Sequence, residues 1–127
     1  MKTVSLIARL LLGLVFLVFG LNGFLAFIPA GPMPAGAVQF VNAMSQSHYM
    51  TVVFAVESMS GVLLLAGQFV PLALTVLAPV IVNIVLFHGF MAPQGLPIAA
   101  LVAILWLLAA HQCRAIFSGL LRRQLAA

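Results

Sequence analysis

The chain has 127 residues, of which 65% are hydrophobic and 5% are charged, and its formal net charge is +4. Soluble domains carry about 25% charged residues, so this composition excludes a soluble core and indicates one membrane-embedded domain. The single cysteine, Cys113, excludes an internal disulfide and any Cys-x-x-Cys chemistry. The basic residues lie near the two ends of the chain and form no mixed basic and aromatic patch, so nucleic acid is not an expected partner.

Four segments have the apolar length that a membrane-spanning helix needs, which is about 20 residues. They cover about residues 4–28, 50–68, 72–91 and 97–113. Pro29 ends the first segment, and Pro79 lies inside the third and is expected to kink it. The sequence therefore predicts an all-α fold, an integral membrane four-helix bundle that forms a single transmembrane domain over residues 1–127.

A short amphipathic helix is predicted between the first and second spans, over residues 35–47. It follows a proline-rich turn, and its apolar residues Val38, Val41 and Met44 recur at roughly helical spacing among polar ones. Such a helix suits the membrane surface. We expect it either to cover a cavity that reaches the second span or to fill the gap between the first two spans.

The distribution of positive charge predicts the orientation of the bundle. An even number of spans places both termini on one side, where all five Lys and Arg residues lie, including those of an amphipathic tail over residues 114–125. The loops over residues 29–51 and 92–96 contain no Lys or Arg. The positive-inside rule then places both termini in the cytoplasm and these two loops outside.

The only acidic residue, Glu57, lies inside the second span. A carboxylate near the middle of a spanning helix costs about 2.5 kcal/mol or more, so it is normally neutral or paired. Counting 1.5 Å per residue from the outer ends gives depths of about 9 Å for Glu57 and Asn22, about 5 Å for His88 and about 12 Å for Asn83. The sequence predicts one polar layer of these four residues, with Glu57 paired to His88 or Asn83.

This layer has two possible roles. Its members could fix the bundle by hydrogen bonds between helices. Alternatively, they could form an outward-facing ligand or proton site, because ionisable residues inside membranes usually mark such sites. We find no catalytic triad, no nucleotide loop and no set of histidines at one depth that could bind a metal or haem. No catalytic residue, metal or cofactor is therefore expected, and autonomous enzymatic activity is not predicted.

Several motifs together resemble the DoxX family of small bacterial four-helix membrane proteins. They are Arg9-x3-Gly13-x2-Phe16-x3-Gly20, Glu57-x3-Gly61-x2-Leu64-x2-Gly67, a Phe69-x-Pro71 hairpin, and the run from Pro79 through Asn83 to His88. The resemblance implies a four-helix bundle in the bacterial inner membrane and a link to redox biology, since related DoxD-type proteins are subunits of a thiosulfate:quinone oxidoreductase. A basic residue often follows the Gly-Leu-Asn element of the family, and here that position is Gly23.

The resemblance favours an accessory or anchoring subunit of a redox-linked membrane complex, with partner proteins in the bilayer. The second hypothesis is a binding or transport module that takes a small amphipathic ligand, such as a quinone or a lipid, into the polar layer around Glu57. The sequence identifies neither the ligand nor the partner protein.

Overall fold

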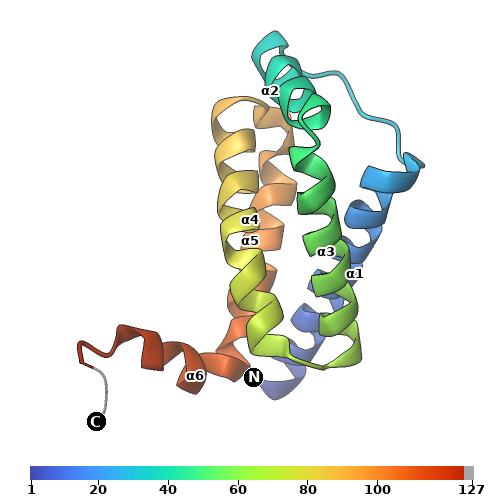
Figure 1. Cartoon of the computed structure of the whole chain (residues 1–127). Helices are drawn as coiled ribbons and strands as arrows, with labels where there is room; N and C mark the ends of the chain where they lie inside the picture. Colours follow the sequence, from blue (N-terminus) through green and yellow to red (C-terminus); the bar gives the residue numbers. More distant parts are fainter. Residues whose placement is uncertain (125–127) are drawn as a thin grey trace.

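The protein is a bundle of four long helices with one short helix across an end (Figure 1), as seen in a computed structural model that describes residues 1–124. The α-helices are α1 (Lys2–Leu25), α2 (Ala35–Gln46), α3 (Tyr49–Ala66), α4 (Val70–Phe90), α5 (Leu96–Ala110) and α6 (Arg114–Ser118). Single 3-10 turns cover Pro93–Gly95, His111–Cys113 and Gly119–Leu121. Within residues 1–124 there is no strand, so the predicted all-α class is confirmed.

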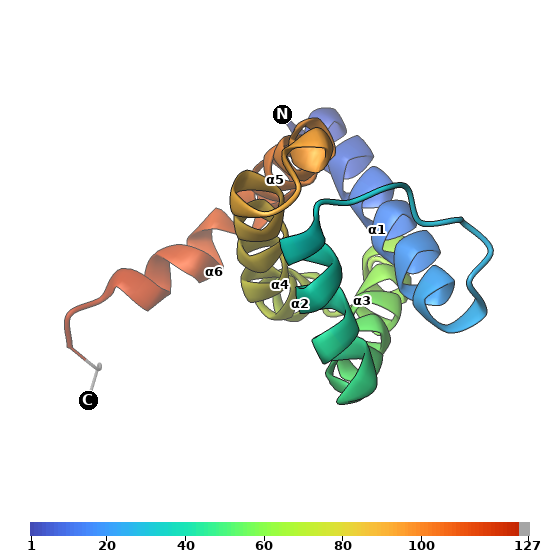
Figure 2. The same ribbon diagram turned by 90° about the horizontal axis from the view of Figure 1, so that it is seen from above.

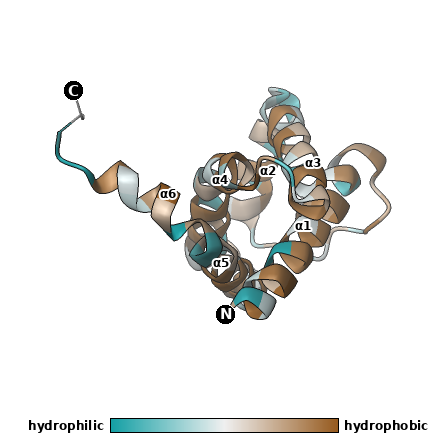
Figure 3. Ribbon diagram, turned by 90° about the horizontal axis from the view of Figure 1, so that it is seen from below, coloured by the Kyte–Doolittle hydropathy of each residue, from teal (hydrophilic) through white to brown (hydrophobic). Residues whose placement is uncertain are grey.

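Four helical stretches in the described chain are long and apolar enough to cross a membrane. They are Lys2–Leu25, Tyr49–Ala66, Val70–Phe90 and Pro93–Leu121. Many large apolar side chains are exposed on the outside of the bundle. Apolar residues make up most of the long helices, whereas polar residues gather toward the ends of the bundle, near the start of α1, around α6 and near α2 (Figure 3). A surface of this kind is stable only against lipid, so the four-helix membrane bundle predicted from the sequence is confirmed.

Two helix ends differ from those predicted from the sequence. Helix α1 ends at Leu25 rather than at residue 28, because Ala26 turns into the left-handed conformation with a φ of 51°. The side-chain oxygen of Asn22 then accepts a hydrogen bond from the Ile28 N–H at 2.6 Å. At the tail, the α-helix covers only Arg114–Ser118, and the last residue of the predicted tail 114–125 lies outside the described residues.

The two ends of the bundle are different. The α2 end carries α2 itself, the end of α1, the start of α3 and the turn between α4 and α5 (Figure 1). The terminal end carries the N-terminus, the Gly67–Phe69 turn between α3 and α4, and α6. Seen along the bundle, α2 lies over α3 and α4, while α1 and α5 lie on the opposite side of the bundle (Figure 2).

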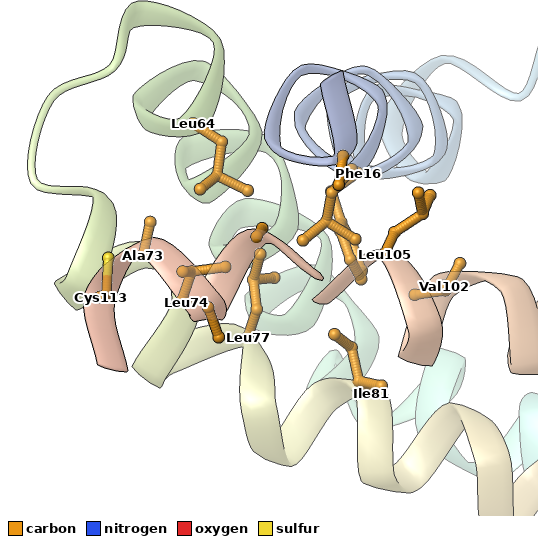
Figure 4. Close-up of a cluster of buried hydrophobic side chains, with 13 residues drawn as sticks. Phe16, Leu64, Ala73, Leu74, Leu77, Ile81, Val102, Leu105 and Cys113 are labelled. Carbon is orange, nitrogen blue, oxygen red and sulfur yellow. The ribbon is translucent and has the colours of Figure 1, made fainter. Parts of the chain in front are cut away.

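The apolar core fills the half of the bundle nearer the terminal end (Figure 4). Ala8, Leu12 and Phe16 of α1 meet Leu64 of α3, and the remaining members come from α4, from α5 and from the 3-10 turn that follows α5. The fully buried leucines of this core are Leu12, Leu64, Leu74 and Leu77. Trp106 of α5 adds a hydrogen bond from its Nε1 to the Leu74 carbonyl of α4 at 2.8 Å.

Glycines bring α1 and α3 into very close contact along a line that we call the glycine seam, formed by Gly13, Gly20 and Gly61. A Cβ added at Gly61 would lie 2.6 Å from the Leu17 nitrogen and 2.8 Å from the Gly13 carbonyl oxygen, both backbone atoms of α1. One at Gly13 would lie 3.1 Å from the Gly61 carbonyl oxygen. Small residues are what allow helix backbones to approach this closely in a membrane.

The glycine seam predicts a sharp difference between two glycine-to-alanine substitutions. Gly61→Ala should destabilise the protein by about 1–3 kcal/mol, because the backbone of α1 has to move away from the new methyl group. Gly89→Ala, also in a helix, meets nothing within 4 Å and should be neutral or slightly stabilising. Unfolding of both variants in detergent, followed by circular dichroism, measures the difference; equal stabilities would contradict the seam.

Candidate functional site

The half of the bundle nearer the α2 end is hollow and holds two cavities. The smaller, of about 270 Å³, lies between α1, α3, α4 and α5. The larger, of about 920 Å³, lies between α2, α3 and α4. Three residues, Glu57, Ile84 and His88, line both, so the two cavities adjoin along these side chains.

Glu57 lies on the inner face of α3 because Gly61, one turn further along, holds that face against α1. The side chain is only 7% exposed. Within residues 1–124 the carboxylate makes no hydrogen bond and no ion pair. The predicted direct pairing of Glu57 with His88 or Asn83 is therefore not formed, and the carboxylate borders the two cavities instead.

The polar groups expected to pair with Glu57 use nearby backbone carbonyls instead. The Asn83 side-chain nitrogen donates to the Pro79 carbonyl at 2.8 Å, one turn back in α4. The Nδ1 atom of His88 lies 3.1 Å from the Ala92 carbonyl oxygen, and the ring packs on Gly95. Such local bonds compete with contacts between helices, which is why counting depth alone predicted the wrong partners.

The four predicted site residues are nevertheless distributed around the same hollow region. Glu57 and His88 line both cavities, Asn83 lines the larger one, and Asn22 lines the smaller one. Asn83 and His88 lie about 140° apart around α4 at the usual helical spacing. Both reach the larger cavity because it extends along α4 from Val76 to His88.

The aromatic residues of the cavities were not among the site residues predicted from the sequence. Phe16, Phe19 and Phe54 line the smaller cavity, and Phe40 and Phe87 line the larger one. Helical spacing offers a signal for two of them, since Phe54 lies three residues before Glu57 and Phe19 three before Asn22. The Phe54 ring packs directly on Gly23, which explains why this position has no side chain.

Helix α2 forms the roof of the larger cavity. Phe40, Ala43 and Met44 of α2 line it, and it extends from there to Glu57. The Phe40 ring packs against that of Phe87 on α4, with centroids 5.7 Å apart. A helix that filled the gap would leave no void beneath it, so the arrangement matches a cover.

The larger cavity is also open to the outside of the bundle on the side of α3 and α4, as the exposure of two of its lining residues indicates. Val52 of α3 and Val76 of α4 contribute to its walls, yet both side chains are exposed, at 65% and 38%. In the bilayer this opening faces the acyl chains. A molecule dissolved in the membrane can therefore reach the cavity without crossing water.

No metal centre is present in the described part of the chain, where no group of three or more His, Cys, Asp or Glu side chains could hold an ion. The walls of both cavities also contain no Lys or Arg. The region can thus provide apolar and aromatic contacts, one carboxyl group, one imidazole, two amides and the hydroxyl groups of Ser47 and Tyr49. All of these groups can bind a molecule.

Fold and site together define a multi-pass membrane protein built as a four-helix bundle with a hollow, covered end. The chain belongs to the DoxX family, whose model, described as DoxX, matches residues 4–89. That range includes the glycine seam, α2, Glu57 and His88. No curated protein and no solved structure matches the chain.

Replacement of Glu57 tests whether its carboxyl group supports the fold. Glu57→Leu should raise stability by about 1–3 kcal/mol, because it removes a buried polar group that has no partner. Glu57→Gln retains a buried polar group and should lie near the wild type. Thermal unfolding in detergent compares the three proteins, and marked destabilisation by leucine would show that the carboxyl group makes a stabilising interaction.

Proposed function

We propose that this protein is a membrane-embedded binding module that takes up a small amphipathic molecule through the lateral opening and holds it beneath α2. The observation that carries this proposal is the covered cavity of about 920 Å³ that reaches the only acidic residue of the chain. Ligand pockets are typically about 300–1,000 Å³, mostly apolar, with a few polar groups that fix orientation. The cavity has this size and this composition.

The geometry favours the binding module over the accessory subunit, which the resemblance to the family had favoured. An accessory subunit needs a docking surface for a partner and does not require an internal space, whereas a binding module does. Glu57 without a partner and next to such a space is a feature of binding, because natural proteins often give up stability at functional sites. A quinone and a lipid are the two ligand types suggested by the sequence, and both have an apolar tail that the cavity could accommodate.

Filling the cavity from its roof tests the proposal. Ala43→Trp places an indole in the larger cavity, whereas Ala100→Trp adds the same group to the exposed face of α5, outside both cavities. Protein purified from native membranes in mild detergent is examined by native mass spectrometry for a bound small molecule. We expect such a molecule on the wild type and on Ala100→Trp, with occupancy reduced at least about tenfold on Ala43→Trp, which corresponds to about 1.4 kcal/mol.

Other results of the same experiment separate the hypotheses. Wild-type protein that carries no small molecule but retains a stoichiometric protein partner would contradict the binding module and support the accessory subunit. Equal occupancy in the two tryptophan variants would show that the ligand binds elsewhere on the bundle. Extraction of the released molecule and its mass then distinguish a quinone from a phospholipid.

We further infer that the protein resides in a bacterial inner membrane with the terminal end in the cytoplasm and α2 on the outside. The support is the confinement of all five Lys and Arg residues to α1 and the region from α6 onward. The loops at the α2 end contain no basic residue. In this orientation the cavity opens in the outer half of the bilayer.

The orientation predicts a labelling pattern for single cysteines in a Cys113→Ala background. Cysteines at Gln46 and Gln94, both exposed at the α2 end, should react with a membrane-impermeant maleimide added to intact cells. A cysteine at Gln124 should react only after the cells are opened. Labelling of position 124 in intact cells would reverse the orientation.

A further inference from the structure

The cavities are lined by one acidic residue and by no Lys or Arg. Glu57 is the only acidic residue in a chain of net charge +4, yet none of the five basic side chains lines either cavity. Arg9, the basic residue nearest to the core in α1, packs on Gly67 at the terminal end instead. The carboxyl group of Glu57 is thus buried with no basic partner in residues 1–124, and its ionised form is favoured only when a ligand brings a positive charge beside it.

The smaller cavity combines this carboxylate with aromatic rings. Phe16 and Phe19 of α1 and Phe54 of α3 line it together with Glu57. The face of an aromatic ring attracts a cation, and aromatic cages are a recurrent means of binding quaternary ammonium groups. A buried carboxylate is stabilised when an opposite charge is placed beside it, so both features favour the same kind of head group.

Other head groups meet less favourable surroundings. An anionic group would find no Lys or Arg on the walls to compensate its charge. A neutral head group would find the amide nitrogen of Asn83 and the Nδ1 of His88 already in contact with backbone carbonyls, which leaves the amide nitrogen of Asn22 and the Nε2 of His88 as donors but offers no charge. The walls therefore discriminate by charge and not only by hydrophobicity.

We propose that the site selects amphiphiles with a positively charged head, an amine or a quaternary ammonium. The head lies beside Glu57 among the three phenylalanines of the smaller cavity, and the apolar tail lies in the larger cavity beneath α2. Glu57, Ile84 and His88 line both cavities, so a molecule that occupies both passes between these three side chains. This inference rests on the binding module proposed above and adds the chemical class of its ligand.

Three probes with the same decyl chain test the inference: decyltrimethylammonium, decanol and decanoate. The full-length protein is reconstituted in nanodiscs of zwitterionic lipid, and empty nanodiscs give the partition of each probe into lipid. Isothermal titration then gives the dissociation constants. We expect the ammonium probe to bind at least about tenfold more tightly than decanol, and decanoate to bind more weakly than either.

Two variants and one control test which residues produce the preference for the ammonium probe. Glu57→Gln should remove the preference for the ammonium probe over decanol, and a circular dichroism spectrum like that of the wild type shows that the variant is folded. Phe54→Leu should weaken binding of the ammonium probe by about fivefold, the loss expected for one cation–π contact, with a smaller effect on decanol. The matched control is Phe90→Leu, which changes a side chain that is 83% exposed and lines neither cavity.

The outcomes separate this inference from the proposed function. Equal affinities for the ammonium probe and decanol, or tighter binding of decanoate, would overturn charge selection and leave the binding module standing. Failure of all three probes to bind the wild type would contradict the module itself. If Glu57→Gln does not fold, an ammonium preference unchanged in Phe54→Leu overturns the proposed cage.

Discussion

The close contact of α1 and α3 along the glycine seam is the constraint on which the rest of the structure depends. In lipid there is little hydrophobic force between helices, so packing between backbones has to hold them together. Gly61 permits that packing, and the position of Glu57 follows from it, since the two residues share one face of α3. The seam therefore fixes the bundle and directs the only carboxylate toward the interior.

The seam also accounts for the division of the bundle into a packed half and a hollow half. Near the terminal end, leucines from four helices belong to one buried cluster around Leu64. Toward the α2 end, α4 and α5 are not drawn in by a similar seam, and the space left between the helices forms the two cavities. Helix α2 then covers a space that the main bundle leaves open.

Features of the structure that depend on one physical rule could be predicted from the sequence, whereas features that depend on several competing contacts could not. The spanning helices follow from apolar length, and the start of α2 follows from the prolines before it. The group of Glu57, His88, Asn83 and Asn22 follows from depth along antiparallel helices. Their pairing did not follow, because Asn83 bonds the carbonyl of Pro79 and His88 contacts that of Ala92, and such short-range bonds depend on rotamers that depth does not specify.

The sequence by itself determined the class of protein: a four-span membrane bundle of the DoxX family with one acidic residue inside it. These properties depend on composition and on local sequence pattern, because an apolar segment in the bilayer has to satisfy its backbone hydrogen bonds by forming a helix. Only the tertiary structure decided that Glu57 has no partner, that phenylalanines surround it, and that a cavity of about 920 Å³ extends from it to α2. The physical reason is that a void is the space that packing leaves unfilled, and its shape depends on how all the neighbouring helices are placed together.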